Sequence, residues 1–353
     1  MTPDPVLSWL GETGPNADLV ISSRVRLARN VAGRPFWGRN AAPDRERIVR
    51  LVEAAADEIP ELAPATWYRL DTLGRPGRLW LHERQLASRE LAGLDPVGRV
   101  RSGAAVVAGE TAAVMCNEED HLRIQAFAPG FALDRAARAA ERVDGELGAR
   151  ISFAFHPEFG YLTGCPTNVG TGLRASVLIH LPALVLTREI GKVLQGLSQV
   201  GLTHRGLWGE GSEVRGNLFQ LSNQTTLGKT EAELLEHLGR LVVEVMGHEA
   251  RARQVLLRDA PMLVEDRVWR AWGLLRHARV LTFDETLNLL SGVRLGIGMG
   301  ILPRRDWMTL NRLLVEAQDA HLAQRTGTGL DDEALPVHRA DLVRGMLDEE
   351  ARG

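Results

Sequence analysis

Two arginines stand two residues apart in a segment whose imperfect alternation of polar and apolar residues predicts a strand. The segment is DLVISSRVRLARN, residues 18–30, and the arginines are Arg24 and Arg26. Side chains two apart lie on the same face of a strand. The two guanidinium groups would then form a forked clamp for an anion such as a polyphosphate. An exposed strand face with solvated arginines explains the pattern equally well.

Three consecutive carboxylates follow a second apolar stretch. AAVV and AAVMC, within residues 104–116, predict a β-hairpin, and Glu118, Glu119 and Asp120 come shortly after it. Adjacent carboxylates repel one another, which favours a cation-binding edge, although a solvated acidic turn is a common alternative. Arg123, three residues after this acidic run, carries a positive charge. Its presence fits a site where a guanidinium meets a phosphate.

The segment GYLTGCPTNVGTGLRASV, residues 160–177, has the composition of a functional loop. Its glycines permit positive φ and close backbone approach, and Pro166 and Asn168 are turn formers. Cys165 and Arg174 would be presented at the edge of this loop. The alternative for Cys165 is a small buried apolar residue.

A glycine-rich segment, THRGLWGEGSEVRG within residues 203–216, predicts a mobile lid over reacting groups. Arg205 and Glu210 are its chemically interesting members. The alternative is a plain surface loop before the strand GNLFQLSNQ.

The chain lacks the usual lysine-based phosphate site. It contains no GxxxxGK[ST] motif, and Lys192 and Lys229, the two lysines among 42 basic residues, lie outside any phosphate loop. A single arginine is therefore weak evidence in this composition, and only arginines inside unusual motifs count. Phosphoryl transfer needs positioning and charge neutralisation, and the arginines at 24, 26, 123, 174 and 205 with Mg²⁺ would suit the triphosphate of ATP.

These segments together resemble known motifs. SSRVRLAR, NEEDHLR and CPTNVGTGLRA are similar to motifs of the phosphagen (guanidino) kinases. FDETLNLLSGVRLGIGMGIL, residues 283–302, resembles the C-terminal domain of the McsB branch, the bacterial protein-arginine kinases. The resemblance covers nearly the whole chain. It implies an α+β fold, with a guanidino-kinase-like catalytic domain (an antiparallel sheet flanked by helices) followed by a smaller all-helical domain.

The resemblance also implies residue roles. Glu119 would be the catalytic base, with Cys165 and Glu210 as further catalytic residues, and Glu118, Glu119 and Glu210 would hold the substrate guanidinium. The implied ATP- and phosphate-binding residues are Ser22, Ser23, Arg24, Val25, Arg26, Arg123, Arg174, Ala175, Ser176, Val177, Leu178, Arg205, Gly206, Leu207, Trp208 and Gly209. The family has a nucleotide-contacting histidine near residue 82, and both His82 and Gln85 are candidates here. No metal-ligand cluster is expected.

An acceptor guanidinium has chemistry that these residues match. It is a poor nucleophile until it loses a proton during attack. Glu119 and Glu210 could hold it by bidentate pairing, align one nitrogen with the γ-phosphate and accept the proton. Cationic neighbours would favour the thiolate of Cys165, which could pair with the guanidinium.

The layout favours a protein as acceptor. Periodic helices beyond about residue 250 predict a second domain, so we expect a catalytic domain at 1–250 and a helical domain for regulation or dimerisation at 251–353. SSRVR begins at residue 22, so the helical N-terminal domain of small-molecule guanidino kinases is expected to be absent. Separately, Thr230 and Glu233 predict a capping box that starts a helix before the boundary at residue 250. The alternatives are a kinase of free arginine or another small guanidino compound, and a catalytically silent phosphate-binding regulator.

Composition limits the cellular compartment and the kinds of partner that we expect. The net charge of −3 gives no general attraction to nucleic acid or anionic membranes, and no apolar run long enough for a membrane span or signal peptide is present. Cys116 and Cys165 as free thiols suit a reducing cytoplasm. The resemblance implies a homodimer in stress-response protein quality control. Its partners would be an McsA-type activator, a CtsR-type repressor and the ClpC–ClpP degradation machinery.

One motif departs from the family pattern. McsB proteins carry an RDxxRA motif that binds phosphoarginine, whereas residues 335–340 read LPVHRA here. Arg339 and Ala340 remain, but the leading Arg-Asp pair is replaced by Leu335-Pro336. We therefore expect feedback by phosphoarginine at this site to be weak or absent.

Overall fold

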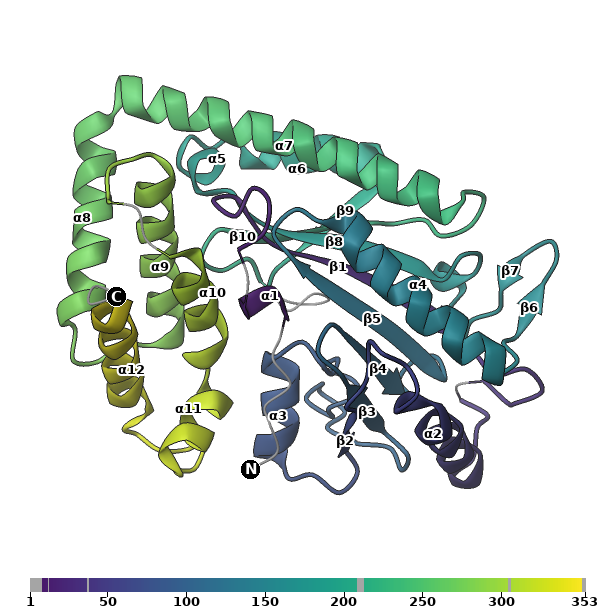
Figure 1. Ribbon diagram of the computed structural model, residues 1–353. Coiled ribbons are helices and arrows are strands. Elements are labelled where there is room, and N and C mark those ends of the chain that lie inside the picture. The colour runs from purple at the N-terminus through teal and green to yellow at the C-terminus, as the bar shows by residue number, and fades with distance from the viewer. Residues whose placement is uncertain (1–7, 12, 37, 208–212, 304–305, 351–353) are drawn as a thin grey trace.

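The computed structural model describes residues 8–11, 13–36, 38–207, 213–303 and 306–350 (Figure 1). Its centre is an eight-stranded antiparallel sheet with the order β2-β3-β4-β5-β1-β8-β10-β9. The strands are β1 (Val20–Arg29), β2 (Thr66–Arg69), β3 (Ala105–Ala108), β4 (Ala112–Cys116), β5 (Leu122–Pro129), β8 (Leu173–His180), β9 (Leu202–Arg205) and β10 (Leu218–Asn223). A separate two-stranded sheet joins β6 (Phe155–His156) to β7 (Gly160–Tyr161). The expected strand at 18–30 and the hairpin at 104–116 are both present.

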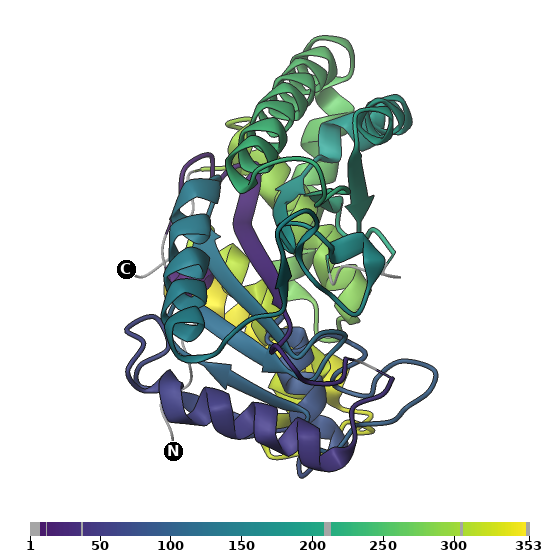
Figure 2. The ribbon, with the colours of Figure 1, turned by 90° about the vertical axis from the view of Figure 1, so that its right-hand side faces the viewer.

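Helices cover one face of the sheet. α4 (Leu133–Arg150) packs on β1 and β5, and α7 (Glu231–Asp259) packs on β8 and β10. Figure 2 shows α4 along one side of the strands. The other elements of the first 250 residues are α1 (Ser8–Gly11), α2 (Ala42–Ala56), α3 (Arg75–Glu83), the 3₁₀ turn η1 (Pro166–Asn168), α5 (Pro182–Leu186) and α6 (Ile190–Gln199).

Alternation along β1 divides its side chains between the two faces of the sheet. Val25 and Leu27 are each 1% exposed and belong to the core under the helices. Ser23 also points to this side, because its hydroxyl accepts the amide of Ala132 at the start of α4 and donates to the Gly130 carbonyl. Arg24 and Arg26 therefore lie on the opposite face.

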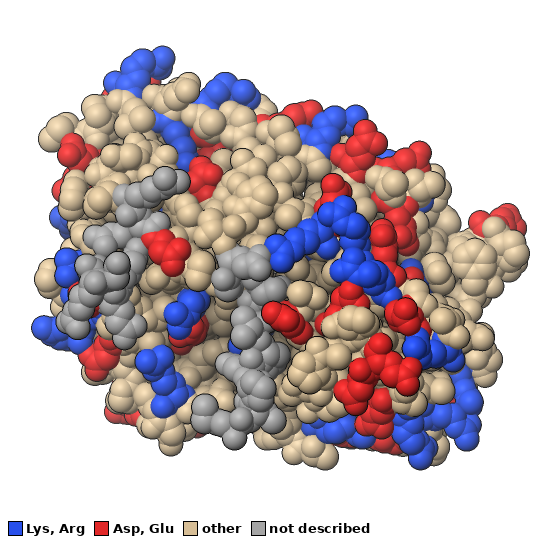
Figure 3. Space-filling view, in the orientation of Figure 1, with Lys and Arg blue, Asp and Glu red and all other residues tan. Residues whose placement is uncertain are grey.

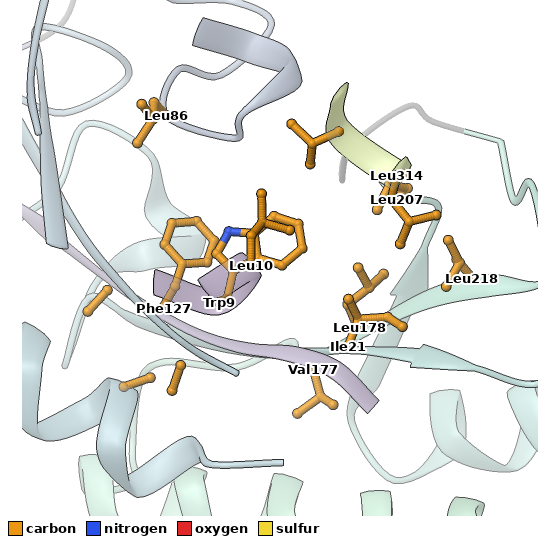
Figure 4. Close-up of a cluster of buried hydrophobic side chains, with 14 of the residues drawn as sticks. Trp9, Leu10, Ile21, Leu86, Phe127, Val177, Leu178, Leu207, Leu218 and Leu314 are labelled. Atoms are coloured by element: carbon orange, nitrogen blue, oxygen red, sulfur yellow. The ribbon is translucent and has the colours of Figure 1, made fainter. Parts of the chain in front are cut away.

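An apolar cluster covers one end of the arginine-bearing face. Trp9 and Leu10 of α1 lie beside Phe127 of β5, and the rings of Trp9 and Phe127 stack with centroids 6.4 Å apart (Figure 4). Leu178, Leu207, Leu218 and Leu314 complete this cluster. One end of the arginine-bearing face is therefore covered by apolar side chains, and the other end is polar.

The segment after α7 is helical, as expected. It contains α8 (Pro261–His277), α9 (Phe283–Gly298), α10 (Trp307–Glu316), α11 (Asp319–Thr326) and α12 (Leu335–Glu350). The domain boundary expected at residue 250 falls inside α7, which runs unbroken to Asp259, so the domain limits remain a prediction. The predicted capping box is present, because Thr230 Oγ1 accepts the Glu233 amide and the Glu233 carboxylate accepts the Thr230 amide.

The surface has no broad region of one charge on the face seen in Figure 1. Basic and acidic side chains are interspersed there (Figure 3). Among the described residues, no helix is long and apolar enough to cross a membrane.

A buried histidine joins the sheet to the helical region. His180 ends β8, and its Nε2 lies 2.8 Å from Ser291 Oγ on α9. Burial, and then the nearby Arg294 and Arg253, hold the pKa of His180 well below its usual range. The unfolded chain therefore binds this proton more readily, and the free energy of unfolding should fall as pH drops below about 6.5.

A His180→Gln variant should be less acid-sensitive than the native chain. Between pH 7.5 and 5.5 it should lose about 1.4 kcal/mol less stability, measured by urea unfolding at both pH values. His204→Gln, at an exposed position, is the matched control and should keep the native pH dependence. An unchanged pH dependence in His180→Gln would contradict the assignment.

Candidate active site

The sheet brings the five arginines singled out from the sequence onto one face. Arg26 lies directly across from Arg174 of β8 and from Gln125 of β5. Arg123 lies two residues along β5 from Gln125, and Arg205 of β9 pairs with Gln220 of β10. Residues directly opposite in neighbouring strands share a face. The register therefore collects charges from four strands that are far apart in the sequence.

These guanidinium groups repel one another in a partly desolvated place. Burial, with further contributions from Arg123 and Arg205, lowers the pKa of Arg24 to about 10. Burial and then Arg24, Arg123 and Arg174 hold the pKa of Arg26 well below its usual range, with Glu118 opposing. Like charges held together in this way are costly unless an anion occupies the space between them. The face is therefore suited to a polyanion.

Several polar atoms on this face are buried without a hydrogen-bond partner among the described residues. They are Arg26 Nε, Gln125 Oε1, Gln220 Nε2 and Ser222 Oγ. Buried polar atoms nearly always have a hydrogen-bond partner in a native protein. Their grouping on the arginine face indicates that a ligand supplies the missing partners.

The two glutamates differ in availability. Glu118 is nearly buried (4% of its side chain exposed) and bonds Arg123, with Nη1–Oε1 at 2.9 Å and Nη2–Oε2 at 2.8 Å. Glu119 also contacts Arg123 Nη2 at 3.0 Å, but 41% of its side chain is exposed. Burial alone would lower the pKa of Arg123, but the carboxylates of Glu118 and Glu119 outweigh it and raise that pKa. Glu119 is therefore the carboxylate that can reach an incoming group.

The third carboxylate of the acidic run, to which the sequence gave no role, ties the cysteine loop to these glutamates. Asp120 Oδ1 accepts Asn30 Nδ2 at 2.6 Å and also the amide of Gly164, and Asn168 Nδ2 approaches Asp120 Oδ2 and Glu119 Oε2, both at 3.4 Å. Asp120 was visible in the acidic run, but no local pattern indicates partners 44 and 90 residues away.

The two cysteines differ in environment. Cys165 is half-buried at the N-terminal end of η1, with Sγ 3.1 Å from Thr167 Oγ1. Cys116 is fully buried on β4, and burial raises the pKa of its thiol to about 12. Of the two thiols, Cys165 is the accessible one.

Arg29 anchors the base of the cysteine loop from the helix-covered side of the sheet. It bonds Asp144 of α4 through Nε and Nη2, both at 2.8 Å, and donates Nη1 to the Thr171 carbonyl at 2.8 Å. Its guanidinium also lies 3.5 Å from the ring centroid of Tyr161. Both ends of the loop are therefore fixed to one buried charge. The sequence showed Arg29 only as a third arginine in SSRVRLAR.

Gln85, and not His82, reaches the arginine face. Gln85 Oε1 accepts Arg24 Nη1 at 3.1 Å, and the Gln85 carbonyl accepts Gln125 Nε2 at 2.9 Å. His82 Nδ1 instead lies 3.2 Å from the Ala87 carbonyl, and burial lowers its pKa. The structure thus places Gln85 at the position where the sequence left two candidates.

Some motif residues cannot present side chains to a ligand on this face. Ser23, Val25, Ala175 and Val177 alternate to the other side and are buried there, and Leu178 and Leu207 belong to the apolar cluster. Strand alternation turns the side chains of the first four away from the arginine face, and the ATP-binding set expected from the resemblance stays a prediction. Ser22, Ser176 and Gly206 are buried. Each lies within two residues of an arginine of the face: Arg24, Arg174 and Arg205, respectively. Trp208, Gly209 and Glu210 lie outside the described residues.

The remnant of the phosphoarginine motif is buried. Arg339 on α12 is 2% exposed and donates Nε to the Ala317 carbonyl at 2.7 Å and Nη1 to the Leu281 carbonyl at 2.9 Å, and it also pairs with Asp319. Burial, opposed by Asp319, lowers its pKa. Ala340 is fully buried.

The comparisons with known proteins first define the class. The family model "ATP:guanido phosphotransferase, C-terminal catalytic domain" matches residues 47–252. Among solved structures, the duplicated taurocyamine kinase of Schistosoma mansoni aligns with a TM-score of 0.59 and 26% identity, over 70% of this chain and 36% of that one. Lombricine kinase aligns with a TM-score of 0.57 over 71% of this chain and 72% of its own, and at 22% identity it shows the fold alone. The fold is that of an ATP:guanido phosphotransferase.

The relatives narrow the class. The model "Protein-arginine kinase McsB C-terminal domain" matches residues 261–352. The protein-arginine kinase of Symbiobacterium thermophilum is 44% identical over 96% of both chains. That of Bacillus subtilis is 40% identical over 99% of this chain and 96% of its own. This chain belongs to the protein-arginine kinase family.

Proposed function

We propose that this enzyme transfers the γ-phosphoryl group of ATP to the guanidinium group of arginine side chains in proteins. The observation that carries the proposal is the cluster of five arginines on one sheet face, bordered by the exposed carboxylate of Glu119. Membership of the protein-arginine kinase family supports a protein as the acceptor.

Each group has a task in this proposal. The arginines neutralise the triphosphate of ATP, and Mg²⁺ delivered with the nucleotide adds further neutralisation. In the described part of the chain, no group of three or more His, Cys, Asp or Glu residues could hold a metal ion. A guanidinium nitrogen attacks the γ-phosphorus, an N–P bond forms, and the bond to the β-phosphate oxygen breaks as ADP leaves. Glu119 accepts the proton that the nitrogen loses.

The acceptor class is tested by a parallel phosphorylation assay. The enzyme receives Mg-ATP with an arginine-rich protein or with free arginine, and products are read by mass spectrometry at neutral pH because phosphoarginine is acid-labile. We expect phosphate on protein arginine and none on the free amino acid. Phosphate only on free arginine would show a metabolite kinase, and no transfer even with an activator would favour a silent regulator.

Replacing Cys165 with alanine should lower kcat at least about tenfold while leaving ATP affinity intact. In our scheme the Cys165 side chain contacts the acceptor guanidinium, so its loss affects the transition state and not nucleotide binding. Steady-state kinetics and calorimetric ATP titration check both parts. Cys116→Ala is the control and should keep kcat, because Cys116 is buried on β4 away from the ligand. Full activity of Cys165→Ala would rule out this role.

Free phosphoarginine should not activate this enzyme appreciably. The family's leading Arg-Asp pair is Leu335-Pro336 here, and Arg339 is occupied by two carbonyls and Asp319. Activity measured over a titration of phosphoarginine should stay flat. Clear stimulation that Arg339→Ala removes would refute this expectation.

The cellular setting is proposed from the family resemblance. The enzyme would act in the cytoplasm as a homodimer, in stress-response protein quality control. An McsA-type activator, a CtsR-type repressor and ClpC–ClpP would be its partners. Sedimentation velocity, alone and with an McsA-type protein, tests the dimer and the activator together.

A further inference from the structure

The N-terminus of α11 is capped by a residue of α3. The Gln318 side chain at the N-cap makes no capping bond of its own. Glu83, the last residue of α3, supplies the acceptors instead: Oε1 takes the Ala320 amide at 3.0 Å and Oε2 takes the His321 amide at 3.2 Å. A carboxylate at this place satisfies two free amides and faces the positive end of the helix dipole.

Side chains around Glu83 reinforce this connection. His321 Nδ1 lies 2.7 Å from Glu83 Oε2, and Gln318 Nε2 approaches the Glu83 carbonyl at 3.4 Å. The His321 ring stacks on Trp80 of α3 at 5.7 Å, and the Arg84 guanidinium lies 4.4 Å from the centroid of the same Trp80 ring. Glu83 is 5% exposed, so these contacts are made in a largely dry interface.

Two residues beyond Glu83, the chain reaches the arginine face. Gln85 takes a left-handed backbone conformation (φ 60°), and its side chain and carbonyl bond Arg24 and Gln125. Arg24 is held between two amide oxygens, those of Gln85 at 3.1 Å and Gln220 at 2.9 Å. The placement of Gln85 therefore helps to set the direction of the Arg24 guanidinium.

The same end of α11 is also bonded to the helical region. Asp319, its first residue, pairs with Arg339 of α12. A continuous set of packed and bonded groups thus runs from α12, through the start of α11 and Glu83, to Gln85 and Arg24.

We propose that Glu83 is a positioning residue through which the helical C-terminal region sets the affinity of the enzyme for ATP. By holding the end of α3 against α11, Glu83 fixes the left-handed backbone of Gln85. The Gln85 side chain in turn sets the direction of the Arg24 guanidinium. A change in the helical region that weakens the cap on α11 lowers ATP affinity without touching the acceptor site.

The test measures nucleotide affinity without any acceptor, so it stands apart from the question of which guanidinium is phosphorylated. Glu83→Ala in the full chain should raise the Kd for ATP about 2- to 30-fold, by calorimetric titration well below the unfolding temperature. Glu83→Gln, which keeps one acceptor oxygen, should give a smaller increase. His321→Phe, which keeps the ring over Trp80 and removes the bond to Glu83, should raise Kd about 2- to 5-fold. It also provides the test if Glu83→Ala does not fold.

A double-mutant cycle separates positioning from general loosening. In a Gln85→Ala background the effect of Glu83→Ala on Kd should nearly vanish, because the connection is already cut. Thr282→Ala, which removes the cap of α9 in the same region, should leave Kd unchanged. An unaltered Kd in Glu83→Ala and His321→Phe would overturn the proposal, as would fold-changes that multiply in the Glu83 and Gln85 double variant.

Discussion

Replacing Glu119 with glutamine should lower kcat by about 10²- to 10⁴-fold while the Kd for ATP stays within about threefold of its native value. The acceptor guanidinium must lose a proton as its nitrogen attacks, and an amide cannot take that proton. Nucleotide binding depends instead on the arginine face, where Glu118 continues to bond Arg123. Single-turnover kinetics and ATP titration separate the two effects.

The control for Glu119 is Glu110→Gln, an exposed carboxylate in the turn between β3 and β4. It should keep native kcat, because it lies outside the arginine face. A Glu119→Gln enzyme with more than a tenth of native kcat would show that another group accepts the proton. Glu210 would then be the next residue to test.

Arg26→Met should remove activity and stabilise the unliganded protein. The loss of kcat/KM should be about 10³-fold or more, because a guanidinium that neutralises a transferring phosphoryl group contributes on this scale. Stability should rise by about 0.5–2 kcal/mol. Burial and then the charges of Arg24, Arg123 and Arg174 hold the pKa of Arg26 well below its usual range, and its Nε has no partner among the described residues. Coupled activity assays and thermal unfolding without nucleotide measure both effects.

The matched control is Arg29, three residues along the same strand. Arg29 is 1% exposed but paired with Asp144 through two bonds. Arg29→Met leaves that carboxylate without its partner and should cost about 3–5 kcal/mol. The same substitution thus has opposite effects on stability. A destabilised Arg26→Met protein would mean that the arginine face is not under electrostatic strain.

The opposite changes in stability expected for Arg26→Met and Arg29→Met show where function conflicts with folding. A face that is costly when empty becomes favourable when a triphosphate fills it, so ligand binding recovers the free energy that folding gives up. The four polar atoms of the arginine face that lack a partner among the described residues, Arg26 Nε included, follow the same logic.

Much of the chemistry was readable from the sequence because it depends on local rules. A two-residue period places Arg24 and Arg26 on one face of a strand. Thr230 and Glu233 form the capping box that their spacing predicts. Helical periodicity beyond residue 250 correctly gave an all-helical segment. The motif resemblance gave the family, which the relatives confirm.

The sequence alone did not distinguish side chains that face the ligand from those that do not within a motif. Val25 and Val177 stand among the expected nucleotide-binding residues, yet both are buried under helices. His82 and Gln85 are three residues apart, and only the left-handed backbone at Gln85 turns its amide toward Arg24.

By itself, the sequence indicated the kind of chemistry: arginines for a polyphosphate, a carboxylate to accept a proton and a thiol in a loop. The tertiary structure decided which of these groups meet. Arg26, Arg123, Arg174 and Arg205 converge through strand order and register. Asp120 secures the cysteine loop, and Glu83 caps a helix 237 residues away. Local preferences act over a few residues, whereas these contacts depend on how the whole sheet and its helices pack.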